Sequence, residues 1–472
     1  MSSTSPAPRA PLTAPEECEL DSIRIQDHGN LSGLEGGRKA DNNDTPPDDA
    51  VHAKIVWNSS RLNMLKLLAT FYSFIVAGAN DAVYGAIIPY LEKYYSITYI
   101  IVSLVFLSPL VGYVAAATLN NTIHRKFGRR GVAILGPSAH VLSYIVISVH
   151  PPYPVLVIAF IFAGFGNGVI DAAWNAWIGI MANANELLGF LHGFYGLGAI
   201  LSPLIATTLI TKAGLSWYHF YLYVMIAAAT LELAACVTVF WGETGKDFRV
   251  NIPKPNNGKK GLMREALGKR ITWVCSVFLL IYVGIEVALG GWIVTFMIQV
   301  REGGGFESGM TSTGFWLGIT VGRVVLGFVT PRLGENLAIP LYLAAGVGME
   351  ILFWLVPNFV VSSVAVAILG FFLGPLFPAA VVATTELLPG HLHVGAIGFG
   401  AAFGGSGACI LPFAVGVIAQ AAGVKVLQPV ILAMLAVALL TWAFGVPSIS
   451  GKPRYAGVKK LVSRLRRAPC GT

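Results

Sequence analysis

Long uncharged blocks alternate with short polar segments along most of this chain, and the apolar residues do not form periodic stripes. From about Leu65 onward, many blocks exceed the roughly 20 residues that a helix needs to cross a bilayer. We therefore predict an all-α integral membrane protein with twelve transmembrane helices. The predicted spans are 65–90, 98–120, 131–149, 155–181, 187–211, 217–241, 272–298, 309–330, 337–356, 359–384, 394–421 and 426–446.

One long polar connection divides these spans into two sets of six. The segment before the first span is rich in Ser, Pro, Asn, Asp and Glu, which is typical of disorder, and no cleaved signal peptide is expected in it. The predicted parts are a disordered cytoplasmic tail (1–61), a first six-helix half (62–242), a cytoplasmic linker (243–270), a second half (271–446) and a basic cytoplasmic tail (447–472).

The two halves repeat a pattern of small residues at an offset of about 206–210 positions. Glycines four residues apart let helices approach closely, so a repeated pattern indicates repeated packing. We predict two pseudo-symmetric halves with a cavity between them. The matches are Gly78, Ala82 and Gly85 with Gly284, Ala288 and Gly291, Gly164 and Gly168 with Gly370 and Gly374, and GAILSP (198–203) with GACILP (407–412).

Composition and charge exclude a soluble protein and argue against a nucleic-acid partner. Of the 472 residues, 55% are hydrophobic and only 12% are charged, against about 25% charged in soluble domains. The basic residues behind the net charge of +8 gather in a few inter-helix segments and the C-terminal tail, as on the cytoplasmic side of membrane proteins. We expect both termini in the cytoplasm and the plasma membrane as the host. Sequons occur at Asn30, Asn43, Asn58 and Asn120, and the first three would then lie in the cytoplasmic tail.

Motifs for other kinds of chemistry are absent from the sequence. The five cysteines are scattered singly, and no Walker pair or zinc-binding spacing occurs. We therefore expect no cofactor, no metal, and neither an ATP-driven pump nor a membrane enzyme. The expected partners are a small solute, protons and the lipid bilayer, with the protein acting as a monomer.

Acidic residues within the predicted spans are the first candidates for function, because a charge in the bilayer core is costly unless it is paired or borders an aqueous cavity. In GFGNGVIDAAWNAW, the residues Asn167, Asp171 and Asn175 recur every four positions and share a helix face that Trp174 borders. This polar stripe favours a surface that binds a polar solute. The alternative is a polar clamp between helices.

Asp81 lies midway along the first span, after Asn80 and one turn before Tyr84, and these two neighbours are candidate substrate-binding residues. Burial disfavours the charged form of a carboxylate and exposure to water favours it, so one residue can take up and release a proton as a cavity changes sides. The alternative is a charge paired with a neighbouring helix. We expect Asp81 to carry the coupling proton.

Four other ionisable residues lie in or near the spans. Glu286 occupies in span seven the position of Asn80 in span one, at an offset of 206, and is a candidate cavity group for proton coupling. Arg323, near the end of span eight, is expected to extend to the membrane surface or to pair in a gate. Glu232 and Glu350 belong to spans that we expect at the periphery, where a structural role is favoured.

The membrane portion, about 65–446, resembles the major facilitator superfamily. The loop HRKFGRR matches the end of the family's signature between spans two and three in Gly128, Arg129 and Arg130, and departs from it at Asn121 and Arg125, where relatives carry glycine and aspartate. The resemblance implies that this loop takes part in gating. The residues so implied are Arg125, Lys126, Gly128, Arg129 and Arg130.

Three segments, NDAVYGAIIPY, GNGVIDAAWNAW and LHGFYGLGAILSPLI, are similar to the fucose–proton symporter branch and its fungal relatives. In that branch, acids in spans one and four are linked to proton coupling and sugar binding, and the matching residues are Asp81 and Asp171. The resemblance further implies a sugar-sized cavity lined by Asn167, Trp174, Asn175 and His192. A satisfied packing histidine is the alternative for His192.

These patterns together predict a secondary transporter that moves a small polar organic solute, a sugar among the candidates, by proton-coupled rocking of two halves. The first alternative is a proton-antiporting exporter of a small metabolite or toxic compound on the same fold. The second is a solute sensor that does not transport.

Overall fold

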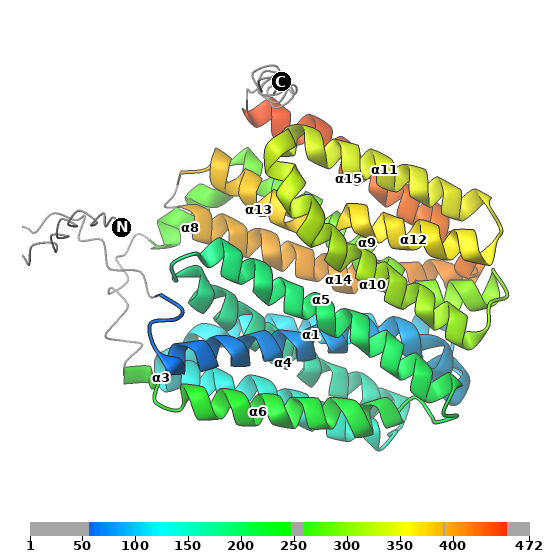
Figure 1. Ribbon diagram of the computed structural model, residues 1–472, viewed down its shortest axis with the longest axis horizontal. Coiled ribbons are helices and arrows are strands. Elements are labelled where there is room, and N and C mark those ends of the chain that lie inside the picture. The colour runs from blue at the N-terminus through cyan, green and yellow to red at the C-terminus, as the bar shows by residue number, and fades with distance from the viewer. Residues whose placement is uncertain (1–55, 247–258, 390–391, 451–472) are drawn as a thin grey trace, which may run out of the picture. The chain divides into compact units, whose positions relative to one another are not determined.

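The computed structural model describes residues 56–246, 259–389 and 392–450, and nearly all of them are helical. The predicted N-terminal tail up to residue 55, residues 247–258 of the linker and the C-terminal tail from residue 451 lie outside the described residues. The helices run side by side along one common direction (Figure 1).

The first half contains α1 (Arg61–Tyr95), α2 (Tyr99–Val102), α3 (Leu104–Ser148), α4 (Tyr153–Gly179), α5 (Ala184–Thr211), a π-helical turn (Tyr221–Met225) and α6 (Ile226–Phe240). The second half follows the short α8 (Lys259–Leu267). It contains α9 (Arg270–Gln299), α10 (Gly305–Leu333), α11 (Glu335–Leu355), α12 (Phe359–Leu373), α13 (Leu376–Leu387), α14 (His393–Ala422), a 3₁₀ turn (Val424–Val426) and α15 (Leu427–Ser450).

Within the described residues, eleven helical stretches are long and apolar enough to cross a membrane. One of them, Tyr99–Ser148, is 50 residues long and contains two predicted spans. These spans are separated at Gly128, whose φ of 71° and ψ of −162° are not helical and favour glycine. The predicted span 359–384 is divided into α12 and α13 next to Pro375. The prediction of an all-α membrane protein with twelve spans is confirmed.

The glycine repeat marks equivalent helix contacts in the two halves. Gly198 of α5 lies against the Ile75 carbonyl of α1, and Gly407 of α14 lies against the Leu280 carbonyl of α9. In each case an added Cβ would overlap that oxygen. The same correspondence holds for Gly164 against Pro109 and Gly370 against Phe315. The repeated sequence pattern therefore reflects repeated backbone approach.

The two halves meet at one end of the bundle. We call this the far end, where α1 ends and α10 begins, and we call the opposite end, where α1 begins, the near end. At the far end, the Tyr99 hydroxyl donates to Gln299 Oε1 (2.5 Å) and the Tyr99 backbone N–H donates to Gln420 Oε1 (2.9 Å). The Phe106 and Trp292 rings lie 6.3 Å apart across the same interface.

Toward the near end, the same helix faces lose their contacts with the other half. Three glycines each contact a side chain of the opposite half. Gly196 of α5 contacts Thr320, Gly309 of α10 contacts Thr207, and Gly416 of α14 contacts Ser103. Positions 7 or 18 residues along a helix return to the same face. Followed toward the near end, Gly196 leads to Gly189, Gly309 to Gly327 and Gly416 to Gly398. Among the described residues, no heavy atom lies within 4 Å of a Cβ added to these three glycines. In the described residues, the halves are therefore in contact at the far end, whereas these three positions toward the near end face open space.

Candidate functional site

Asp81 of α1 is the centre of a hydrogen-bonded group formed by three helices. Its Oδ1 accepts from Asn80 Nδ2 (3.0 Å) and from Asn167 Nδ2 of α4 (2.8 Å). Its Oδ2 accepts from the Tyr195 hydroxyl of α5 (2.9 Å). All three donors are neutral, and within the described residues the ion pairs found do not include Asp81. A partly exposed carboxylate without a cationic partner can exchange a proton without breaking an ion pair.

Two residues behind Asp81 fix the orientation of this group. Asn80 is fully buried, and its amide also donates to the Tyr84 hydroxyl (2.9 Å). The Tyr84 ring packs edge-on against Phe106 and Phe160, so the hydroxyl is held in the core of the first half. The carbonyl oxygens of Asn80 and Asn167 are buried and have no hydrogen-bond partner among the described residues. The group therefore retains unused acceptors beside the carboxylate.

Asp171 extends the group along α4 toward the near end. It lies one turn beyond Asn167, its side chain is exposed, and its Oδ1 accepts from Asn175 Nδ2 (2.9 Å). Asn167 on the same face is bonded to Asp81, so this face is directed to the α1 side of α4. The expected polar stripe of Asn167, Asp171 and Asn175 is therefore contiguous with the Asp81 group.

Trp174 is not part of this group. Its side chain is fully buried and stacks on Phe240 of α6, with ring centroids 4.6 Å apart. Its position three residues after Asp171 turns it about 60° around the helix from that side chain. We assign Trp174 to packing between α4 and α6.

The second half has an ion pair at the position where the first half has Asn80 and Asp81. Glu286 of α9 accepts from Arg323 Nη2 of α10 (2.9 Å) and from the Tyr282 hydroxyl (2.5 Å). The Arg323 and Glu286 side chains are 17% and 6% exposed, respectively. Arg323 is therefore paired inside the bundle, and it does not extend to the membrane surface.

His192 of α5 lies between the two halves. Its ring packs edge-on against Phe74 of α1 at 5.6 Å and lies 6.2 Å from Phe377 of α13. It is three residues before Tyr195, toward the near end. Its ring contacts are with these two phenylalanines, and among the described residues no hydrogen bond joins it to the Asp81 group.

The loop at Gly128 is tied to the end of α6 in its own half. Glu243 accepts from Lys66 of α1 and from Arg129 Nη1 (2.5 Å), and its backbone oxygen accepts from the Arg130 N–H (3.0 Å). The Arg130 guanidinium lies 3.5 Å from the Trp241 ring centroid. Arg125 and Lys126 lie with their backbone against Gly245. In the described residues these contacts stay within the first half and the beginning of the linker.

Several of these partners were not predicted from the sequence. Tyr195 and Tyr282 supply hydroxyls to Asp81 and Glu286, and Glu243 joins Lys66 to Arg129. Tyr282 could have been found, because it precedes Glu286 by one helical turn. The contact between Tyr195 and Asp81 joins residues 114 positions apart and carries no local signal.

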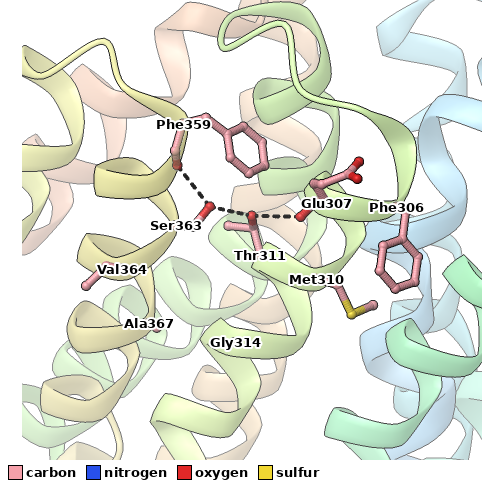
Figure 2. Close-up of a pocket in the computed structure, with 9 residues that line it drawn as sticks. All are labelled: Phe306, Glu307, Met310, Thr311, Gly314, Phe359, Ser363, Val364 and Ala367. Carbon is pink, nitrogen blue, oxygen red and sulfur yellow. Dashed lines mark hydrogen bonds between the residues drawn. The ribbon is translucent and has the colours of Figure 1, made fainter.

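A separate groove of about 420 Å³ lies between α10 and α12, away from all the residues proposed above (Figure 2). Its floor contains a hydroxyl pair, with Thr311 Oγ1 2.8 Å from Ser363 Oγ. The remaining lining is mostly apolar and comprises Phe306, Glu307, Met310, Gly314, Phe359, Val364 and Ala367. The groove gives the candidate site no additional residues.

Comparison with known proteins identifies a family match and several relatives. The model of the Major Facilitator Superfamily matches residues 70–412. The chain is 30% identical over 423 residues to Bypass of stop codon protein 6 of Saccharomyces cerevisiae, covering 83% of this chain and 84% of that protein. It is 20% identical over 319 residues to the Glucose/mannose transporter GlcP of Bacillus subtilis, covering 67% of this chain and 78% of that protein.

Solved structures with the same arrangement of helices include two transporters. A bacterial homolog of the human lysosomal transporter Spinster, in an inward-facing and unoccupied conformation, superposes with a TM-score of 0.66 over 83% of this chain and 98% of that chain. A D-xylose–proton symporter superposes with a TM-score of 0.65 over 82% and 99%. Both are 12% identical to this chain, so the likeness concerns the fold.

Proposed function

Because the chain belongs to the Major Facilitator Superfamily and is a multi-pass membrane protein, we propose that it is a secondary active transporter of a small polar organic solute, coupled to protons through Asp81. The observation that carries the proposal is the Asp81 group. A carboxylate held only by neutral donors lies between two halves that are in contact at the far end, whereas positions toward the near end face open space.

In the proposed cycle, the halves rock about this group and expose it alternately at each end. Asp81 takes up a proton on one side and releases it on the other, because water stabilises its charged form and burial does not. Asp171 couples solute binding to protonation, and the Asn167 and Asn175 amides bind the solute. His192 and the Glu286–Arg323 pair complete the site, and the arginine holds Glu286 in its charged form.

The near end faces the cytoplasm in this proposal, and the plasma membrane is the host. Lys66, Arg129 and Arg130 all lie at the near end, and basic residues are retained on the cytoplasmic side. The described conformation is then inward-open. Labelling of a single cysteine introduced at Lys126 by a membrane-impermeant reagent tests the orientation, and labelling in intact cells would contradict it.

The proposed solute is polyhydroxylated and about the size of a sugar. The carboxylates of Asp81 and Asp171, of which Asp81 is partly exposed and Asp171 exposed, suit a solute with several hydroxyl donors. Among similar proteins, the names of GlcP, the D-xylose–proton symporter and the nucleoside transporter NupG point to solutes of this kind. A thermal-shift screen of sugars, polyols and nucleosides on the purified protein would identify the substrate.

Reconstituted vesicles with an imposed pH gradient test the coupling. We expect Asp81→Asn to abolish gradient-driven accumulation while it retains exchange of solute at equal concentrations, because the amide can bond to the same neighbours but cannot titrate. Glu307→Gln is the matched control, since Glu307 is an exposed carboxylate in the separate groove. Accumulation by Asp81→Asn equal to that of the wild type would overturn the proton role.

The same vesicles determine the direction of coupling. Solute uptake that carries protons inward indicates symport, and solute uptake that drives protons outward indicates the antiporting exporter. Binding without any flux in either condition would identify a sensor.

A further inference from the structure

A second groove, of about 370 Å³, opens at the near end of the first half. It lies between α3 and the segment that follows α6, and we call it the α3/α6 groove. Phe127, Ile134 and Leu135 form its apolar side, and Lys126 and Arg130 form its charged side. Among the described residues, no acid lines the groove. The groove is therefore basic on one side and apolar on the other, and it shares no residue with the Asp81 group.

Close backbone contacts fix the walls of this groove. An added Cβ at Gly245 would lie 2.4 Å from the Lys126 carbonyl oxygen, so the segment after α6 lies directly on the backbone of α3. An added Cβ at Gly131 would lie 2.4 Å from Phe127 Cβ, so the phenylalanine packs over a glycine. The groove is therefore a defined feature of the backbone and does not depend on side-chain rotamers alone.

The two cations of the groove have no acidic partner among the described residues. The ion pairs found there do not include Lys126 or Arg130. The carboxylate of Glu243 is already shared by two other basic residues. The Arg130 guanidinium lies 3.5 Å from the Trp241 ring centroid, an arrangement that leaves its N–H groups available at the edge of the ring. Two positive charges are therefore available to an anion.

Large apolar side chains are exposed beside these charges. Phe127 is 56% exposed, Leu135 is 38% exposed and Trp241 is 52% exposed. Exposure to water would suit the two cations, but it would be unfavourable for these three side chains. Trp241 comes directly after the last residue of α6, and tryptophan at the end of a transmembrane helix is typical of the membrane–water interface. This surface therefore suits the boundary between lipid and water.

The apolar side of the groove continues along α3 toward the far end. Leu135, Leu142 and Ile145 are exposed, and spacings of seven and three residues place them on one helix face. His140, two residues before Leu142, is fully buried, so the exposed face is turned away from the packed side of the helix. The neighbouring α6 lies at the edge of the bundle away from the second half (Figure 1). The groove therefore opens onto a face that contacts acyl chains.

We propose that the α3/α6 groove binds a phospholipid with an anionic headgroup, such as phosphatidylserine. Arg130 and Lys126 bind the headgroup, since guanidinium and ammonium groups form strong charge-assisted hydrogen bonds to phosphate oxygens. An acyl chain lies on Ile134 and Leu135 and continues along α3. A free anion would leave this apolar side unused, so the groove suits a lipid better than inorganic phosphate. The assignment to the cytoplasmic leaflet rests on the proposed orientation, but the preference for an anionic lipid does not.

Phosphatidylserine with a photoactivatable acyl chain, added to the full-length protein in detergent, tests this inference. We expect cross-links to map to the apolar side of the groove. The variant Lys126→Gln/Arg130→Gln is expected to lose roughly 10- to 30-fold in apparent affinity, because each basic residue near a membrane surface contributes about fivefold. Lys269→Gln/Arg332→Gln is the matched control and leaves the affinity unchanged. Both of its side chains are exposed at the near end of the second half.

Phosphatidylcholine and inorganic phosphate separate the other possible occupants. Phosphatidylcholine with the same photoactivatable chain is expected to label the groove at least about fivefold more weakly, because its headgroup carries no net charge. Equal labelling by the two lipids would show that any acyl chain fits, and would overturn the role of the headgroup. Inorganic phosphate that suppresses the cross-link at the concentration of the lipid would identify a free-anion site instead, and would also overturn the proposal.

The single variant Lys126→Gln keeps the test decisive should the double variant not fold. Its side chain is exposed, and the contact of Arg130 with Trp241 is retained. We expect it to lose about 3- to 5-fold in affinity for phosphatidylserine, and an unchanged affinity would contradict the proposal. If the lipid binds as expected and the vesicles show no proton-coupled transport, this inference stands and the proposed function fails.

Discussion

The carboxylates of the spans differ in the partners that stabilise them. Asp81 is held by three neutral donors, Glu286 by an arginine and a tyrosine, and Glu232 by a histidine. A carboxylate with a cationic partner keeps its charge through the cycle, whereas one with neutral donors can change its protonation. The sequence identified all three acids, because an acid in an apolar span is conspicuous. It did not identify Arg323, His140 and Tyr195 as their partners, which come from other helices 37 to 114 positions away.

Removing one member of the Glu286–Arg323 pair is expected to destabilise the protein. Arg323→Gln leaves a nearly buried carboxylate without its cation, which typically costs about 3 kcal/mol. Glu286→Gln/Arg323→Gln removes both charges and is expected to recover most of the lost stability. Melting temperatures of the purified proteins check this, and a double variant as unstable as the single one would refute the pairing.

At the scale of the helices, glycine determines how closely neighbouring elements approach. The sequence predicted close approach at the repeated glycines, and Gly198 and Gly407 confirm it in equivalent contacts. The sequence did not distinguish these positions from glycines that face open space, such as Gly405, only two residues before Gly407. Both glycines lie in α14, and they differ only in whether the backbone of α9 lies against them.

This difference leads to a matched pair of substitutions in α14. Gly407→Ala is expected to lower stability by about 1–3 kcal/mol, because its methyl group would overlap the Leu280 carbonyl of α9. Gly405→Ala meets no atom within 4 Å and is expected to be neutral or slightly stabilising, since alanine favours helix. Thermal unfolding in detergent measures both. Equal loss in the two variants would contradict the packing of α14 on α9.

For the whole molecule, the closure at the far end defines the conformation. Tyr99 joins the first half to two residues of the second, Gln299 and Gln420. A hydrogen bond of this kind contributes about 0.5–1.5 kcal/mol, which is enough to change the ratio of two conformations several-fold.

Tyr99→Phe is therefore expected to shift the protein toward the state that opens at the far end, by about 2- to 10-fold. Distances between spin labels on the two halves at the far end would then lengthen in part of the population. Tyr94→Phe is the control, because the Tyr94 hydroxyl lies 3.2 Å from His150 of the same half. Identical distance distributions for Tyr99→Phe and the wild type would show that this contact does not hold the far end closed.

The sequence by itself determined the number of spans and their approximate positions, and it singled out the acids within them. Both follow from local physics, because a backbone in hydrocarbon must satisfy its hydrogen bonds within a long helix, and a charge there needs a specific reason. Only the tertiary structure decided which side chains accompany those acids. Trp174 turned out to pack against Phe240, while Tyr195 and His140 took up places beside or behind the Asp81 group. A helix brings many side chains to each depth of the membrane, and its neighbours decide which of them face the space between the halves.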